Sequence, residues 1–261
     1  MKTSFFGQVL DILQWYWPSL ALGVQNTLII SLTGTMIGLV IGMIVGGVRA
    51  IRLDFNAPAG LKTGKKILDF IGKAYIDVFR GTPMMVQAVF LYYALLNVIH
   101  WDKLTAAIFV ISINTGAYMA EIIRSGIQAV DSGQTEAARS LGMSNIQTMS
   151  TVVLPQAVRN AFPAIGNEFI VNIKDSSVLM IISIADLMFQ AKSIAGSTFQ
   201  FTATYGITAA IYFMLTSIAS MILNMIERKM NTSRTSFPQS STDPSSMTLA
   251  ARSEGGHHRH E

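Results

Sequence analysis

Long stretches of this chain contain no charged residue. Asp, Glu, Lys and Arg are all absent from residues 12–48, 81–99 and 193–226. About 20 apolar residues are enough to cross the hydrocarbon core of a bilayer as a helix, and segments in water rarely go so long without a charge. The pattern therefore predicts an integral membrane protein of the all-α class.

We expect about five membrane-spanning helices. Only Asp102 and Lys103 separate the second apolar run from the third, so these two spans should form an antiparallel hairpin. A break is expected near Lys174, and the run 193–226 is too long for one perpendicular helix, so a short outer helix should precede the last span. The expected spans cover about residues 23–48, 84–101, 104–123 and 160–173, and a fifth begins near Tyr205.

Three regions of different composition follow from this pattern. Residues 1–22 should form an interfacial helix, because Phe6, Leu10 and Trp17 share one helical face. Residues 23–230 form the transmembrane domain. Residues 231–261 are rich in Ser, Thr and Pro and should be a disordered polar tail. Its last residues include His257, His258 and His260, which are either a weak metal site or simply part of the tail.

Glycines recur at four-residue intervals within the first expected span. Residues so small on one face of a membrane helix allow a second helix to approach closely. We therefore expect a partner helix along this stripe, although glycines scattered through a tolerant helix would give the same spacing. The stripe consists of Gly34, Gly38, Gly42 and Gly46.

The distribution of basic residues predicts the orientation. With five spans and the N-terminus outside, all but four of the 19 Lys and Arg fall on the cytoplasmic side, in agreement with the positive-inside rule. Residues 49–80 and 124–159 would then be cytoplasmic, as would the C-terminus. We expect no signal peptide. The four exceptions are Lys2, Lys103, Lys174 and Lys192.

Composition excludes several classes of function. The chain is 51% hydrophobic and 13% charged, far from the soluble average, and its formal charge of +4 lies in short segments rather than on one nucleic-acid-binding face. The absence of cysteine excludes disulfides and thiol catalysis. No glycine-rich phosphate loop ending in lysine is present, so this chain should not hydrolyse ATP by that mechanism.

A polar segment between the third and fourth spans carries a spaced motif. It resembles the EAA loop of ABC importer permeases, in which Glu-Ala-Ala is followed by Gly and then by an apolar residue and Leu-Pro. Small alanines would let a short helix seat in the groove of a partner, and the glycine would permit a sharp turn. An ordinary exposed helical hairpin is the alternative. The matching residues are Glu136, Ala137, Ala138, Gly142, Val152, Leu154 and Pro155.

Three further stretches resemble the polar amino-acid uptake branch of these permeases. They are YIDVFRGTP at 75–83, SINTGAYMAEIIRSGIQAV at 112–130 and LPQAVRNAFPAIGNEFI at 154–170. The resemblance implies the type I importer fold, in the plasma membrane of a prokaryote. It also implies a second permease chain, a pair of cytosolic ATPases that bind ATP and Mg²⁺, and an external amino-acid-binding protein. The chain itself would bind no cofactor or metal and would couple to the ATPase through the EAA-like loop.

Two polar stripes could line a substrate pathway. Ionisable residues within spans are costly and therefore suggest function. The alternatives are that Glu121 pairs with Arg124 and that Glu168 supports helix packing, while Arg80 is expected to be an interfacial anchor rather than a ligand. The stripes, each with i, i+4, i+7 spacing, are Asn114, Tyr118 and Glu121 on the third span and Glu168, Asn172 and Asp175 on the fourth.

Two other classes of membrane protein remain as rivals. A secondary transporter would also place polar residues in interrupted spans, but usually with more spans or repeated halves. An intramembrane enzyme would need a catalytic set such as Ser with His inside the membrane, and His100 stands at an outer end.

Overall fold

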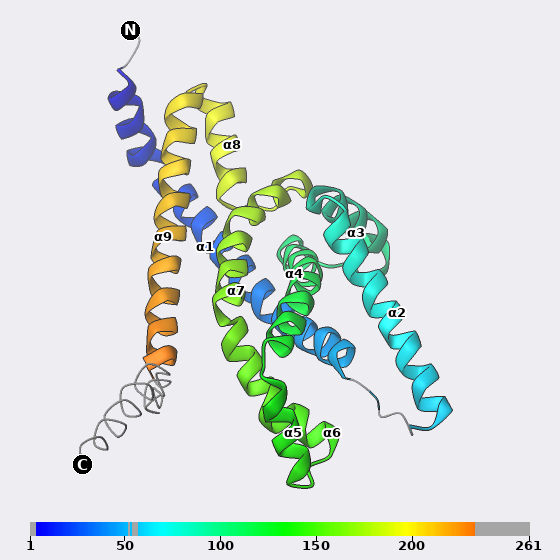
Figure 1. The fold of residues 1–261 in the computed structure, drawn as a ribbon. Helices are drawn as coiled ribbons and strands as arrows, with labels where there is room; N and C mark the ends of the chain where they lie inside the picture. The colour runs from blue at the N-terminus through cyan, green and yellow to red at the C-terminus, as the bar shows by residue number, and fades with distance from the viewer. Residues whose placement is uncertain (1–3, 52, 54–56, 233–261) are drawn as a thin grey trace, which may run out of the picture. The chain divides into compact units, whose positions relative to one another are not determined.

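The computed structural model describes residues 4–51, 53 and 57–232, and every regular element in these ranges is helical (Figure 1). Residues 233–261, with most of the predicted tail and its histidines, lie outside the described residues. Two further elements, η1 and η2, are a π-helix and a 3-10 helix. The elements are α1 (Phe5–Ala50), α2 (Ala59–Gly81), α3 (Met84–Ile99), α4 (Lys103–Gln128), α5 (Ser132–Ser140), α6 (Asn145–Gln147), η1 (Thr148–Val153), α7 (Leu154–Asp175), η2 (Ser176–Ile182), α8 (Leu187–Thr198) and α9 (Phe201–Thr232).

Within the described ranges, three helices are long and apolar enough to cross a bilayer: α1, α4 and α9. The segment Asn145–Ile182 and α8 meet at a bend of 54° and would add a fourth crossing if they count as one broken span. α3 has 16 residues, about 24 Å of helix, which is less than the roughly 30 Å of the hydrocarbon core. The total of five spans depends on α3 and stays a prediction.

α1 is one continuous helix where the sequence predicts two. Pro18 lies inside it. A proline can bend a helix without ending it, so the helix continues past this residue. Its 46 residues extend about 69 Å, more than twice the hydrocarbon core of about 30 Å. Part of α1 must therefore leave the core or lie along its surface. The interfacial role of residues 5–17 and the division at residue 22 stay predictions.

α4 lies at the centre of the packed helices, with α1 on one side, α7 on another and the end of α2 on a third (Figure 1). Val110, Met119 and Ile123 of α4 are fully buried. Polar residues on this helix are therefore held against neighbouring helices, and their partners decide what each can do.

The glycine stripe of α1 packs directly on α4. A Cβ added at Gly38 would lie 2.9 Å from the Cβ of Thr115, and one added at Gly46 would lie 2.5 Å from the carbonyl oxygen of Ala120. The other two glycines of the stripe are equally crowded by α4 side chains. The expected close approach of a second helix is confirmed, and that helix is α4.

α2 occupies a segment that the sequence analysis treats only as a basic cytoplasmic connection. It is a 23-residue helix whose Gly72 and Ile76 are buried. The Tyr75 hydroxyl donates a hydrogen bond to the carbonyl oxygen of Ile113, 2.5 Å away and near the middle of α4. The last turns of α2 therefore lie beside a helix that is long enough to cross a bilayer, and the cytoplasmic boundary at residue 80 stays a prediction.

The connection from α3 to α4 is the short turn that the sequence predicts. Asp102 caps α4, with its Oδ2 accepting hydrogen bonds from the backbone N–H groups of Leu104 and Thr105, at 3.0 and 3.2 Å. The Thr105 hydroxyl also donates to Asp102, and these hydrogen bonds lower the pKa of its carboxyl group below the ordinary value. The turn thus fixes where α4 begins.

The end of the described chain follows the predicted order of elements. α7 stops at Asp175, close to the expected break, and a 3-10 turn ends at Ser183 with a φ of 59°. Asp186 then caps α8 by accepting from the backbone N–H of Phe189 at 2.9 Å. α8 is the expected short helix, and the last span begins at Phe201, four residues before the predicted start.

Candidate functional site

The two predicted polar stripes lie on neighbouring helices, α4 and α7. A cavity of about 550 Å³ opens between these helices and the end of α2. Tyr118, Glu121 and Glu168 line it, together with Arg80 from α2. We call it the α4–α7 hollow. Its remaining lining residues are small, apolar or weakly polar: Ile122, Ser125, Gly126, Ala129, Asn160, Ala161 and Ala164.

Arg80 of α2, which the sequence analysis expects to be an interfacial anchor, lies over a tyrosine of α4. Its guanidinium carbon is 5.3 Å from the centre of the Tyr118 ring, a cation–π distance. Its charge also attracts the Glu168 carboxylate, although no ion pair within 4.0 Å joins the two among the described residues. The sequence analysis missed helix α2, which carries this side chain onto α4, and the role of Arg80 as an interfacial anchor stays a prediction.

Glu168 is half-buried and makes no hydrogen bond to any residue in the described part of the chain. A carboxylate held away from water without a partner is costly. The hollow therefore contains one positive and one negative group that attract each other without direct contact. A ligand carrying both charges could bridge them.

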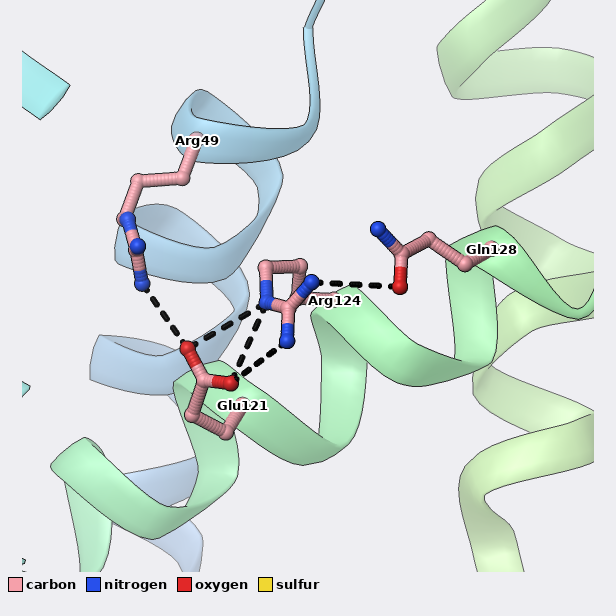
Figure 2. A network of polar contacts seen from close by, with 4 residues as sticks. All are labelled: Arg49, Glu121, Arg124 and Gln128. Carbon is pink, nitrogen blue, oxygen red and sulfur yellow. Dashed lines mark hydrogen bonds and ion pairs between the residues drawn. The ribbon is translucent and has the colours of Figure 1, made fainter.

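Glu121 is compensated by arginines (Figure 2). Its Oε1 accepts from the Nη1 of Arg49, at the end of α1, at 2.8 Å, and its Oε2 accepts from the Nη2 of Arg124 at 2.7 Å. Arg124 in turn donates to Gln128 at 3.1 Å. The pairing of Glu121 with Arg124 is confirmed, while Arg49 was not foreseen. Glu121 thus both lines the hollow and ties the end of α1 to α4.

Asn114 lies outside the hollow, in a buried hydrogen-bond network. Its Nδ2 donates to the Oε1 of Gln87 at 2.8 Å. Gln87 donates onward to the carbonyl oxygens of Phe79 and Thr82, both at 2.9 Å. Asn114 therefore holds the turn between α2 and α3 against α4, which is a structural task.

Asn172 joins three helices. It is 3% exposed, donates to the Thr35 hydroxyl of α1 at 2.7 Å and accepts from the Thr115 hydroxyl of α4 at 3.1 Å. Asp175, the last residue of α7, is not among the residues that line the hollow. The hollow thus brings together Tyr118, Glu121 and Glu168 and leaves out the other three predicted pathway residues. Whether any of the six meets substrate stays a prediction.

The EAA-like motif forms helix α5 and the turn after it. Asp131 caps this helix by accepting from the backbone N–H of Gly133 at 2.7 Å. Glu136 and Ala137 are exposed, whereas Ala138 is buried. Gly142 has a φ of 82°, a left-handed conformation that side chains other than glycine adopt at a cost. The sharp turn expected at this glycine is confirmed.

Two apolar residues beside α5 are strongly exposed. Leu141 is 84% exposed and Ile146 is 74% exposed. Leu141 precedes the Ser144–Gln147 capping box and Ile146 lies inside it. In this box the Ser144 hydroxyl accepts from the Gln147 backbone N–H at 3.3 Å. The sequence analysis missed these residues, although apolar side chains in a polar loop were a visible signal. The segment around α5 therefore exposes the charged Glu136 and two large apolar residues, Leu141 and Ile146, and exposed apolar side chains can mark a contact with a partner protein.

Within the described ranges, no group of three or more His, Asp and Glu side chains could hold a metal ion.

Residues 56–232 match the family described as "Binding-protein-dependent transport system inner membrane component". The chain is 36% identical over 220 residues to the glutamine transport system permease protein GlnP of Escherichia coli (strain K12), covering 82% of this chain and 95% of that protein. It is also 36% identical over 214 residues to the probable amino-acid ABC transporter permease protein YckA of Bacillus subtilis (strain 168), covering 82% and 89%.

Solved structures resemble the fold as well. A crystal structure of an amino acid ABC transporter with histidines superposes with a TM-score of 0.74 at 37% identity, over 88% of this chain and 100% of that chain. An inward-facing structure of the MetNI methionine ABC transporter gives a TM-score of 0.70 at 20% identity, over 81% and 96%, and supports the fold alone.

Proposed function

Since this chain belongs to the family of binding-protein-dependent transport system inner membrane components, we propose that it is the permease subunit of an ATP-driven importer whose substrate is an amino acid. The predicted fold class, the type I importer permease, is confirmed by the likeness to an amino acid ABC transporter at 37% identity. By its family, the chain is thus an inner-membrane component of a transport system and is not itself the ATPase. Its substrate, partners and orientation are parts of the proposal.

The α4–α7 hollow carries the proposal for the substrate. Arg80 and Glu168 present opposite charges on its wall, while Glu121 is already compensated by two arginines. An amino acid carries a carboxylate and an ammonium group at fixed separation. We expect Arg80 to attract the carboxylate through a charge-assisted hydrogen bond and Glu168 to attract the ammonium group, because the half-buried Glu168 carboxylate then gains a partner.

Charge balance narrows the substrate class. One unpaired positive and one unpaired negative group favour a molecule without net charge over a dicarboxylic one, because a second carboxylate would face Glu168. A substrate with a cationic side chain is also accepted, because the Glu168 carboxylate attracts that side chain. The amino-acid and glutamine permeases among the relatives agree with this chemistry.

Coupling to ATP hydrolysis is assigned to α5. Its exposed Glu136 with the apolar Leu141 and Ile146 offers a docking surface for a cytosolic ATPase, which would bind ATP and Mg²⁺. The tight turn at Gly142 holds this surface against the rest of the segment. An external amino-acid-binding protein and a second permease chain complete the proposed assembly.

The proposed orientation places the N-terminus outside and the α5 segment in the cytoplasm. The natural absence of cysteine allows a direct test. A single cysteine at Asn145 should resist a membrane-impermeant thiol reagent in intact cells and react after the cells are opened, with a cysteine at Lys103 as the outward control. Labelling at position 145 in intact cells would reverse the orientation.

Purification with the subunits that co-elute tests the function itself. The assembly, reconstituted with the external binding protein, should hydrolyse ATP faster when amino acid is added and should accumulate that amino acid in an ATP-dependent manner. Uptake by the chain alone, driven by an ion gradient and insensitive to ATP, would favour a secondary transporter instead.

A further inference from the structure

A second cavity lies between α5 and the ends of two membrane-spanning helices. It has a volume of about 750 Å³ and is walled by the end of α1, the end of α4, α5 and the π-helix η1. We call it the α5 pocket. It shares no lining residue with the α4–α7 hollow.

Positive charge predominates in the α5 pocket. Arg49, Arg124 and Arg139 line it, against Glu136 as the acidic residue of the wall. Arg49 and Arg124 share the single carboxylate of Glu121, so these five groups keep one net positive charge. Arg139 donates through Nη2 to the Oδ1 of Asn145 at 2.5 Å, which fixes its side chain at the rim. The pocket therefore attracts an anion.

Thr148 provides a second and independent sign of a ligand. It lines the pocket and is 2% exposed, yet its Oγ1 has no hydrogen-bond partner in the described part of the chain. Buried hydroxyl groups are nearly always paired. Thr148 also opens the π-helix η1, a distortion that is frequent at functional sites. An oxygen-bearing ligand in the pocket would satisfy this hydroxyl.

The surroundings indicate where such an anion would come from. α4 is long and apolar enough to span a bilayer, and its 26 residues extend about 39 Å, little more than the hydrocarbon core of about 30 Å, so its end lies near the bilayer edge. Apolar side chains of Ile127 and Met149 line the same pocket, which suits the glycerol and acyl part of a lipid. Basic pockets between the ends of membrane-spanning helices are known to bind anionic headgroups.

We propose that the α5 pocket binds the phosphate group of an anionic phospholipid, with the arginines supplying charge and the Thr148 hydroxyl donating a hydrogen bond. The lipid would then lie between the end of α1 and α5, beside the proposed coupling surface. This proposal does not depend on which substrate is transported.

Lipid retention by the purified assembly tests the proposal. The assembly would be exchanged into mixed phosphatidylglycerol and phosphatidylcholine, and bound lipid would be counted by native mass spectrometry. We expect phosphatidylglycerol to be retained preferentially, and Thr148→Val and Arg139→Gln each to weaken its retention by about tenfold, since each removes a hydrogen bond to a charged group.

Matched variants control for general damage. Thr216→Val removes a helical hydroxyl that already donates to a backbone carbonyl, and Arg159→Gln removes an arginine outside the pocket lining. Both should retain phosphatidylglycerol as the unaltered assembly does. Unchanged retention in both pocket variants would overturn the proposal. Displacement of the lipid by equimolar inorganic phosphate would overturn the assignment to lipid, because the ligand would then be a free anion.

Discussion

α4 meets its two large neighbours in opposite ways. Against α1 it packs on a stripe of glycines so closely that no added carbon fits, and against α7 it leaves a hollow lined by charged side chains. The first contact needs no ligand and is complete within the chain. The second contains a carboxylate and a guanidinium that attract each other without direct contact. The α1 side therefore fixes the helix in place, and the α7 side is where we propose that a substrate binds.

A larger side chain in the glycine contact between α1 and α4 should have the largest effect. Gly42→Leu places a bulky side chain against Met119 of α4, and overpacking of this kind destabilises by about 3 kcal/mol or more. We expect the chain to lose its monodisperse elution peak in detergent and its thermal transition. Gly47→Leu, on the same helix with open space around it, should leave both unchanged. Equal behaviour of the two variants would refute the close contact.

Changing the turn after α5 should abolish transport without disturbing the contacts of α4 with α1 and α7. Gly142→Asp forces a side chain into a left-handed conformation, at a local cost of about 1–2 kcal/mol, and adds charge beside the docking surface. We expect normal membrane levels, no ATP-driven uptake and ATPase activity that no longer responds to substrate. Gly60→Asp, in open space near the start of α2, is the control. Normal uptake by the Gly142 variant would exclude α5 as the coupling element.

Removing the hydrogen bonds by which Asn172 joins α7 to α1 and α4 should have an intermediate effect. Asn172→Ala deletes hydrogen bonds to Thr35 and Thr115 and leaves the buried Thr115 hydroxyl unpaired, which costs about 1–3 kcal/mol. The midpoint of thermal unfolding should fall while the preference among substrates stays the same. A changed preference with an unchanged midpoint would place Asn172 in the pathway instead.

The sequence predicted the α1 side of this comparison better than the α7 side. Glycines at four-residue spacing place small residues on one helical face, and close approach of a neighbour is the interpretation that the structure confirms. The sharp turn at Gly142 was predictable as well, because the motif from Glu136 to Gly142 is a contiguous segment of the sequence. The polar stripes are different, because i, i+4, i+7 spacing shows that residues share a face but not which neighbour that face meets. The sequence therefore did not show that Asn114 and Asn172 make buried hydrogen bonds to neighbouring helices.

Arg80 and the helix that carries it were missed for a related reason. The charges in α2 conceal the helical spacing of Gly72, Ile76 and Phe79, which face the rest of the chain. Without that helix nothing in the sequence could place Arg80 over Tyr118. Likewise, Arg49 and Glu121 are 72 residues apart and meet only because the glycine stripe brings α1 onto α4.

The central claim is that the charges of the α4–α7 hollow choose the substrate. Glu168→Gln keeps the shape of the side chain and removes its charge, which leaves Arg80 as the uncompensated charge of the hollow. Asp69→Asn, which alters a carboxylate paired with Lys65 on α2, serves as the control.

The deciding measurement is ATP-driven uptake of cationic, neutral and dicarboxylic amino acids by reconstituted assemblies of equal composition. We predict that Glu168→Gln lowers uptake of a cationic amino acid most, by about tenfold, because both of its positive groups lose the carboxylate and are repelled by Arg80. Uptake of a neutral amino acid should fall by less, and uptake of a dicarboxylic one least, because its second carboxylate no longer faces Glu168. An equal loss for every substrate, with assembly intact, would contradict the account and would make Glu168 a packing residue.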